Sequence, residues 1–287
     1  MSRVLAVVVA IGMIAGALYV RGRIDDDDSS GGAGGGGGSL LCAPELEEAC
    51  REASDDVTVE DAAASAQRLL TEDTLDQDGW ATPGPWPAMV DALRSAAGRP
   101  ALFGDGGEAV ASSRLALVAP PEAPEGWRAV GEATGAGDLR LGWRDPATGL
   151  GVLQVGAFAA GFFDGPDFAT NDFAEPGFTS YLEGIEREAA VTGEPLERRL
   201  QQGVSFSEAV ISFQAEADPL LEDAAPGRRG DLRPLYPEPV IAVEAVVAGD
   251  GADDVGTELQ ERGWDGPAPS GLPNPGVLAA LWQEISR

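Results

Sequence analysis

Histidine and lysine are both absent from this chain, and all 19 basic residues are arginine. Without histidine, the chain alone cannot form a Ser-His-Asp triad, a Cys-His nucleophile pair or a histidine-ligated zinc site. Without lysine, it has neither a Walker A lysine nor a Schiff-base lysine. Carboxylate chemistry remains available, but no pair stands out among 48 acidic residues. The sequence therefore predicts a protein that is not an enzyme and needs no cofactor.

Basic residues are also scarce relative to acidic ones, and the net charge is −29. Residues 1–39 hold three arginines and four aspartates, so the remainder carries −28. A field of this sign repels nucleic acids and anionic lipid surfaces, so we expect no nucleic-acid partner. Apolar residues make up an ordinary 44% of the chain. The part after residue 39 is long enough to form a globular core.

Only one long apolar run is present, Val4–Val20, and it carries no charge. It lies at the short limit for a membrane helix, which needs about 20 apolar residues. It is either an uncleaved anchor within residues 1–23 or a signal peptide cut at the Ala15-x-Ala17 motif. Residues 24–39 are acidic and glycine-rich, typical of a flexible tether spanning about 20 Å, which favours the anchor. The flanking arginines, one before the run and two after it, leave the orientation close to a tie. The short N-terminal tail and the two cysteines favour a single-pass cell-membrane protein with an extracytoplasmic domain.

Cysteine occurs only twice, at Cys42 and Cys50. Two closely spaced cysteines in an exported chain predict a disulfide; two buried thiols are the alternative. If Pro44–Cys50 were one regular helix, Cys50 would lie about 9 Å along its axis. A disulfide needs Cα atoms within about 7 Å of each other. The bridge therefore requires the chain to turn back between Cys42 and the helix.

Short apolar strands alternate with helices along the rest of the chain, which predicts an α/β fold with a mostly parallel sheet. The aromatic, proline-rich residues 79–87 are expected to form a loop leading into a helix. The expected strands are 40–43, 57–59, 112–120, 139–143, 208–213 and 239–247. The expected helices are 44–53, 60–70, 86–96, 178–191, 274–286 and one that follows a turn within 145–163.

Five segments carry a resemblance in their order: LLCAPELEEAC, DGWATPGPWPAMV, ASSRLALVAP with EGWRAV, LRLGWRDPATGLGVLQVGA and LRPLYPEPVIAVEAVV. This order resembles the type 2 periplasmic binding proteins, the extracellular solute-binding proteins of ABC transporters. The resemblance covers about Leu40 to Trp282. It implies an α/β fold of two lobes around a cleft, with lobe 1 at 40–115, lobe 2 at 116–239 and a return to lobe 1 at 240–287. It also implies a small-molecule solute and a membrane transporter as partners.

Loops beyond the carboxyl ends of strands, where helices begin, are where such a fold places a ligand. Thr148 and Gly149 begin an apolar helix, whose unpaired N–H groups beside Arg144 favour a small polar or anionic solute. Ser112 and Ser113 are expected to face them. Ordinary helix capping is the alternative for each of these residues. The candidate ligand-binding residues are Ala43, Glu45, Ser112, Ser113, Arg144, Thr148, Gly149 and Tyr236.

Other polar and aromatic segments are weaker candidates. Trp80 and Trp86 are expected either to line the cleft or, more commonly, to lie in the core. The segment Asp73–Trp80 resembles a calcium loop but has Thr74 and Pro85 where acidic ligands are needed, so we interpret it as a turn and expect no metal site.

Three functions fit these observations. The one we favour is a membrane-tethered protein that binds a solute outside the membrane, for transport or sensing. The second is an envelope interaction protein that keeps the fold without a ligand and contacts other envelope proteins. The third is a carboxylate-dependent hydrolase.

Overall fold

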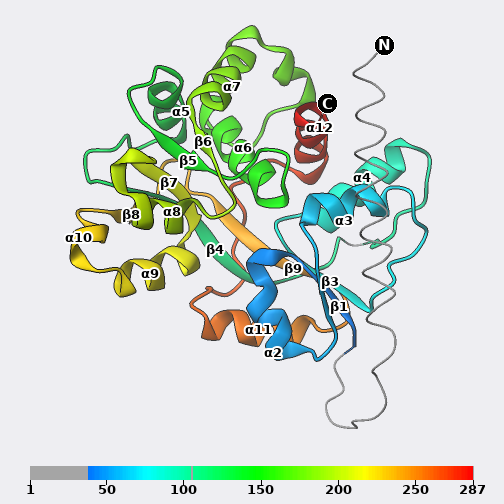
Figure 1. The fold of residues 1–287 in the computed structure, drawn as a ribbon. Coiled ribbons are helices and arrows are strands. Elements are labelled where there is room, and N and C mark those ends of the chain that lie inside the picture. The colour runs from blue at the N-terminus through cyan, green and yellow to red at the C-terminus, as the bar shows by residue number, and fades with distance from the viewer. Residues whose placement is uncertain (1–37, 105, 287) are drawn as a thin grey trace, which may run out of the picture. The chain divides into compact units, whose positions relative to one another are not determined.

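A nine-stranded sheet runs through the computed structural model, which describes residues 38–104 and 106–286 (Figure 1). Its strand order is β2-β1-β3-β9-β4-β7-β5-β6, and β8 pairs with part of β4. The strands are β1 Leu40–Cys42, β2 Val57–Val59, β3 Gly79–Pro83, β4 Glu108–Ala119, β5 Leu141–Trp143, β6 Ala190–Val191, β7 Ala209–Phe213, β8 Arg233–Leu235 and β9 Ala242–Gly249.

Helices cover the sheet, and α2 and α11 lie side by side (Figure 1). Helix α2 contacts β1 and β2, and α11 contacts β4 and β9. The α-helices are α2 Glu47–Ala53, α3 Ala62–Leu69, α4 Trp86–Ala96, α5 Trp127–Gly135, α6 Gly149–Phe162, α7 Pro176–Glu188, α8 Pro195–Gln202, α9 Gln214–Asp223, α10 Pro226–Arg229, α11 Ala252–Glu261 and α12 Pro275–Ile285. The 3-10 helices within the described residues are η2 Pro44–Leu46, η3 Thr170–Ala174 and η4 Gly203–Ser205.

The long strand β4 joins two halves of the sheet. Its residues Glu108–Arg114 pair with β9, next to β3, β1 and β2, which we call the first half. Its residues Leu115–Val118 pair with β7, next to β5 and β6, which we call the second half. Because β4 leads into the second half and β9 leads back, the central pairings are antiparallel. The expected mostly parallel sheet is therefore wrong at the centre and right only at the two wings.

The segment expected to be a loop contains a buried strand, β3. Trp80 has no exposed surface, and its ring lies 5.5 Å from that of Phe103. Pro83 stands at the very end of the strand, where its missing N–H costs least. The prolines after it misled the expectation because they follow the strand and do not interrupt it. Helices α5, α8, α9 and α11 were also not expected, although α5, α8 and α11 each have an apolar face of helical period that could have identified them.

Helix α6 lies in the core, and all but the last of its residues are buried. Its glycines allow close packing: a Cβ on Gly161 would lie 2.5 Å from the Cβ of Trp127, and one on Gly156 would lie 2.8 Å from Leu278. Helix α12 packs against both α6 and α4. As expected, Asn274 caps α12 by accepting a hydrogen bond from the N–H of Val277.

The predicted disulfide between Cys42 and Cys50 is present, with the Cα atoms 6.5 Å apart. Extended Ala43 and the 3-10 helix η2 separate β1 from α2, and this turn supplies the reversal that the spacing requires. The bridge ties the end of the strand to the middle of the following helix.

The expected anchor or signal segment Val4–Val20, and the tether as far as residue 37, lie outside the described residues. Among the helices that the structure describes, none is long and apolar enough to cross a membrane.

Candidate functional site

The start of helix α6, expected to meet a ligand, is satisfied within the protein. The carboxylate of Asp61 accepts hydrogen bonds from the N–H of Gly149 at 3.0 and 3.2 Å, and it also caps helix α3. The Thr148 hydroxyl accepts a hydrogen bond from the N–H of Gly151 and donates one to the carbonyl of Asp145, at 3.2 and 2.7 Å. The protein's own carboxylate thus stands where the sequence predicts an anionic solute.

Close packing surrounds this contact. A Cβ on Gly149 would lie 2.7 Å from the Cβ of Ala62, so the two helices touch backbone to side chain. The indole N–H of Trp86 donates to the carbonyl of Gly149 at 3.2 Å, and the ring meets that of Trp282 edge-on at 5.0 Å. Trp80 and Trp86 have no exposed surface, so both belong to the core. We call the region formed by Asp61, Ala62, Trp86 and Gly149 the closed side.

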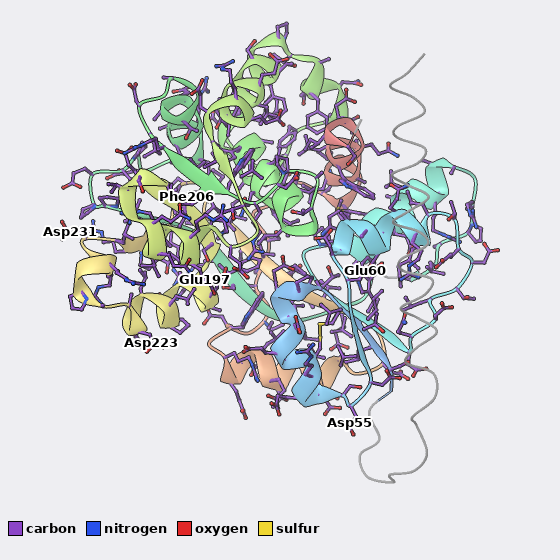
Figure 2. The ribbon with its side chains drawn as sticks, viewed as in Figure 1. Asp55, Glu60, Glu197, Phe206, Asp223 and Asp231 are labelled. Atoms are coloured by element: carbon purple, nitrogen blue, oxygen red, sulfur yellow. A yellow bond between two sulfur atoms is a disulfide. The ribbon has the colours of Figure 1, made fainter. Side chains whose placement is uncertain are left out.

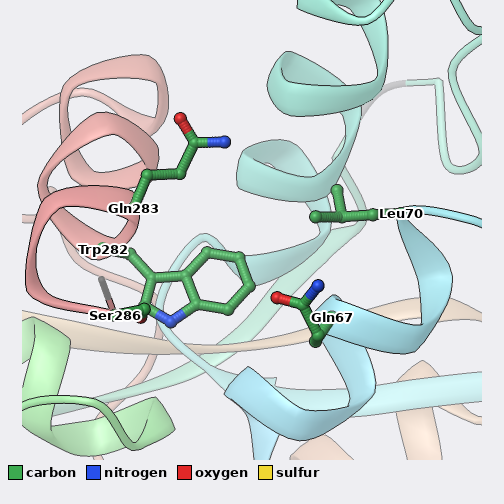
Figure 3. A pocket seen from close by; sticks show the side chains of 5 residues that line it. All are labelled: Gln67, Leu70, Trp282, Gln283 and Ser286. Carbon is green, nitrogen blue, oxygen red and sulfur yellow. The ribbon is translucent and has the colours of Figure 1, made fainter. Parts of the chain in front are cut away.

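A small hollow of about 290 Å³ lies beside the closed side, between α3 and α12 (Figure 3). None of the side chains that line it is charged, and the indole of Trp282 forms one wall. The lining residues are Gln67, Leu70, Trp282, Gln283 and Ser286. Its volume lies just below the range of small-molecule pockets, about 300 to 1,000 Å³, so this hollow is a poor candidate for a solute site.

The two serines proposed to face Thr148 make contacts elsewhere. The buried Ser112 hydroxyl donates to the carbonyl of Gly266 at 2.7 Å. The buried Ser113 hydroxyl accepts a hydrogen bond from the N–H of Ala215 at the start of α9, at 3.1 Å. The capping alternative thus describes Ser113, and Ser112 joins β4 to the segment after α11.

Two further candidates, Ala43 and Tyr236, do not line the cavity described next. Ala43 is fully buried, and its N–H donates to the carbonyl of Ala81 at 2.9 Å. The ring of Tyr236 lies 4.1 Å below the guanidinium of Arg114. Ligand contact by Ala43 and Tyr236 therefore stays a prediction.

A cavity of about 920 Å³ lies between the two halves, bordered by α2 and α11 of the first and by α8 and α9 of the second. Figure 2 labels one of its wall residues, Glu197 on α8. Its apolar lining includes the rings of Phe213 and Trp264. The charged lining comprises nine carboxylates and three arginines: Glu45, Glu47, Glu48, Glu194, Glu197, Glu216, Asp218, Glu222, Glu261, Arg51, Arg144 and Arg262. We call this region the acidic cavity.

Two of the predicted site residues, Glu45 and Arg144, meet in the acidic cavity. Arg144 Nη1 lies 3.6 Å from Glu45 Oε1, and Arg144 Nη2 lies 3.5 Å from Glu216 Oε1. Glu45 comes from η2 in the first half, whereas Arg144 and Glu216 come from the second. The side chains of Glu45, Arg144 and Glu216 are 7%, 16% and 31% exposed. One guanidinium therefore links carboxylates of both halves.

The surroundings of Glu45 disfavour its charge. Burial raises the pKa of this carboxyl, the neighbouring Arg144 lowers it, and repulsion from Asp61 and Glu216 raises it further, with a net increase. On the opposite wall, burial and the charges of Glu194 and Glu216 raise the pKa of Glu197. The nine carboxylates that line the cavity thus have only three lining arginines to balance their charge.

Glu216 was not anticipated from the sequence. It lies in the first turn of α9, directly after strand β7. Acidic residues in a first turn mark a helix start, the signal that identified α2. The segment QAEADP, which follows the strand, carries the same signal, and this signal could have identified Glu216.

No protein-family model matches this chain, and no curated protein matches it in sequence. Solved structures do match its fold. Iron-bound HitA from Pseudomonas aeruginosa superposes with a TM-score of 0.54 and 13% identity, covering 87% of this chain and 99% of that one. A periplasmic thiamin binding protein superposes with a TM-score of 0.50 and 12% identity, covering 87% of this chain and 96% of that one. The fold is that of a type 2 periplasmic binding protein.

The resemblance found in the sequence is thus confirmed for the fold. At these identities the likeness shows the fold alone, so the role of each residue in this type 2 periplasmic binding protein fold rests on its own geometry. By that measure, the closed side is packed and internally bonded, and the acidic cavity is the accessible region between the halves.

Proposed function

We propose that this chain is an extracytoplasmic solute-binding protein, held at the cell membrane by its N-terminal segment, that delivers a small polar solute to a transporter or sensor. The observation that carries the proposal is the acidic cavity, which both halves of a type 2 fold border. Its volume of about 920 Å³ lies within the range of small-molecule pockets, about 300 to 1,000 Å³.

The charged groups at the centre of the cavity support a polar solute. The Glu45–Arg144–Glu216 contacts are longer than direct charge-assisted hydrogen bonds of about 2.7 to 2.9 Å. A solute with polar groups can complete the hydrogen bonding of these side chains. Because the three residues come from both halves, the same solute would contact both walls and couple them.

The location outside the cytoplasm is supported by the disulfide, since such bonds persist mainly in oxidising compartments. Two fusions at Ser39 test the topology, one to alkaline phosphatase and one to a reporter active only in the cytoplasm. We expect activity from the phosphatase fusion. Activity from the cytoplasmic reporter alone would refute this location.

A thermal-shift screen of the full-length chain tests solute binding. The solutes are sugars, amino acids, amines, oxyanions and organic acids. A solute at 100 times its Kd stabilises a protein by about 2.7 kcal/mol, which is a measurable shift. We expect one class to raise the melting temperature. An absence of shifts from every class would contradict solute binding.

One observation favours the second candidate function, an envelope interaction protein without a ligand. On the closed side, Asp61 and Ala62 fill the space at the start of α6. If the screen finds no solute, pull-down from envelope extracts with the full chain, compared with a charge-reduced variant of the acidic cavity, would test that function.

A further inference from the structure

We propose that the solute is an organic cation with ammonium groups, held by Glu45 and Glu216 beside Trp264 in the acidic cavity. This inference rests on the proposed function and names the solute class. Its basis is the cavity's own chemistry, which combines excess carboxylate, a buried acid whose cationic partner lies 3.6 Å away, and aromatic rings.

The arginines of the cavity are already engaged, so little positive charge remains for an anion. Arg51 pairs with Glu47, and Arg262 pairs with Glu258 at 2.8 Å. Arg144 is shared between the two central carboxylates. Six further acids line the cavity, and a cation between them would relieve their mutual repulsion.

Glu45 gives the independent indication of a ligand. Its side chain is 93% buried, since 7% is exposed, and it lines the cavity. Its own backbone N–H donates a hydrogen bond to the carboxylate, and its cationic partner, Nη1 of Arg144, lies 3.6 Å away. A buried carboxylate with a single backbone donor is costly, so an ammonium group that donates to it would bind favourably.

The aromatic wall adds selectivity for an organic cation. The rings of Phe213 and Trp264 lie 5.3 Å apart and both line the cavity. A ring face attracts a cation within about 6 Å of its centroid, most strongly for tryptophan, and it also contacts the methylene groups of an alkylamine. The attraction between a cation and a ring face is not available to a carboxylate or a phosphate group.

A metal ion fits this cavity less well than an organic cation. In the part of the chain that the structure describes, no three acidic, cysteine or histidine residues converge as metal ligands. The carboxylates are spread over walls that enclose about 920 Å³. That distribution suits an extended molecule with separated amino groups.

The closed side is consistent with exclusion of anions. The helix N-terminus that would attract an anion already binds the Asp61 carboxylate. Asp61 therefore acts as a specificity-determining residue, because it removes the strongest anion-binding position between the halves.

Isothermal titration calorimetry of the full-length chain with spermidine tests the inference, with citrate and glucose as the anionic and neutral probes. The buffer contains about 150 mM NaCl, which limits long-range attraction to about 8 Å. We expect spermidine to bind and the other two not to bind. Glu45→Gln should weaken spermidine binding at least about tenfold, and Glu216→Gln should weaken it similarly.

The matched control is Glu122→Gln, which removes the same charge from an exposed loop outside the cavity. It should change the Kd by less than about twofold, in line with screening of exposed charges. Circular dichroism checks folding; if Glu45→Gln does not fold, Glu216→Gln carries the test.

The possible results separate the two claims. Equal effects of Glu45→Gln and Glu122→Gln would overturn the assigned site. Binding of citrate or glucose without spermidine would overturn the cationic class but leave solute binding intact. No binding of these probes, together with no shift from any class in the thermal screen, would overturn both.

Discussion

The closed side and the acidic cavity lie between the same two halves of the sheet, but their carboxylates differ in how completely they are hydrogen-bonded within the protein. On the closed side, the Asp61 carboxylate accepts hydrogen bonds from backbone N–H groups of two helices and lies near the buried Trp86. In the acidic cavity, Glu45 and Glu216 share one arginine across a solvent-accessible space. A single connection, from β5 to α6, supplies both Arg144 and Gly149.

The difference shows how one fold separates stability from recognition. A carboxylate that is fully bonded inside the protein fixes the halves together and has no capacity left for a solute. A carboxylate that is only loosely paired keeps that capacity at a cost in stability. Substitutions on the closed side and in the acidic cavity should therefore change the stability of the protein by different amounts.

The largest expected effect is on the closed side, with Trp86→Ala. Removing a fully buried tryptophan should lower the free energy of unfolding by about 3 to 5 kcal/mol. The matched variant Trp264→Ala removes a ring that borders the acidic cavity, so fewer packing contacts are lost and the decrease should be smaller. Urea denaturation measures both. Equal losses would show that the two sides are equally packed.

Loss of the Cys42–Cys50 bridge should come next. The bridge holds α2, a wall of the acidic cavity, to strand β1. In the chain-entropy model a loop of this length contributes about 2 to 3 kcal/mol. The double variant Cys42→Ser, Cys50→Ser should lose this amount in urea denaturation, and reduced wild-type protein should match it. An unchanged midpoint would contradict the prediction.

Asp61→Ala should cost about 1 to 2 kcal/mol, because it removes the cap of α3 together with the hydrogen bonds from Gly149. Asp61→Asn keeps a side-chain oxygen that can accept these bonds and serves as the control. Thermal denaturation compares the two. If alanine and asparagine were equally tolerated, the contact would not hold the closed side together.

The smallest effect concerns Glu45 and depends on pH. Because burial raises the pKa of this carboxyl, the folded protein favours its protonated form. That contribution to stability is present below the unfolded pKa of about 4.3 and is lost as the pH rises through the folded pKa. Glu45→Gln keeps a neutral side chain, so it should match wild type near pH 4 and be more stable at pH 7. Urea titrations of both proteins at the two pH values measure this. A Glu45→Gln variant less stable than wild type at pH 7 would contradict the prediction.

Local patterns predicted the parts of the fold that depend on neighbouring residues. The spacing of Cys42 and Cys50 predicted their bridge, and Asn274 followed by proline predicted the start of α12. Strand β3 was missed because its aromatic and proline content favoured a loop, whereas burial against Phe103 decides the structure.

The candidate site was predictable only in part. Glu45 and Arg144 were identified from helix-start and loop signals, and the structure brings them together. The contact of Asp61 with Gly149 joins residues distant in the chain, so no local pattern reveals it. Ligand contact at Thr148, Gly149, Ser112 and Ser113 stays a prediction, although the polar groups of these residues now have partners within the protein.

The position of β9 in the sheet has a consequence for how the protein is made. Strands β3 and β4 follow each other in the sequence but do not pair, because β9 lies between them. During synthesis, the first half stays incomplete until residue 249 has emerged, and α12 follows later still. Such long-range pairing slows folding and disfavours a stable fold of the early segments. Completion of the sheet this late would suit the proposed location outside the cytoplasm, because a chain that is still unfolded can cross a membrane before it folds.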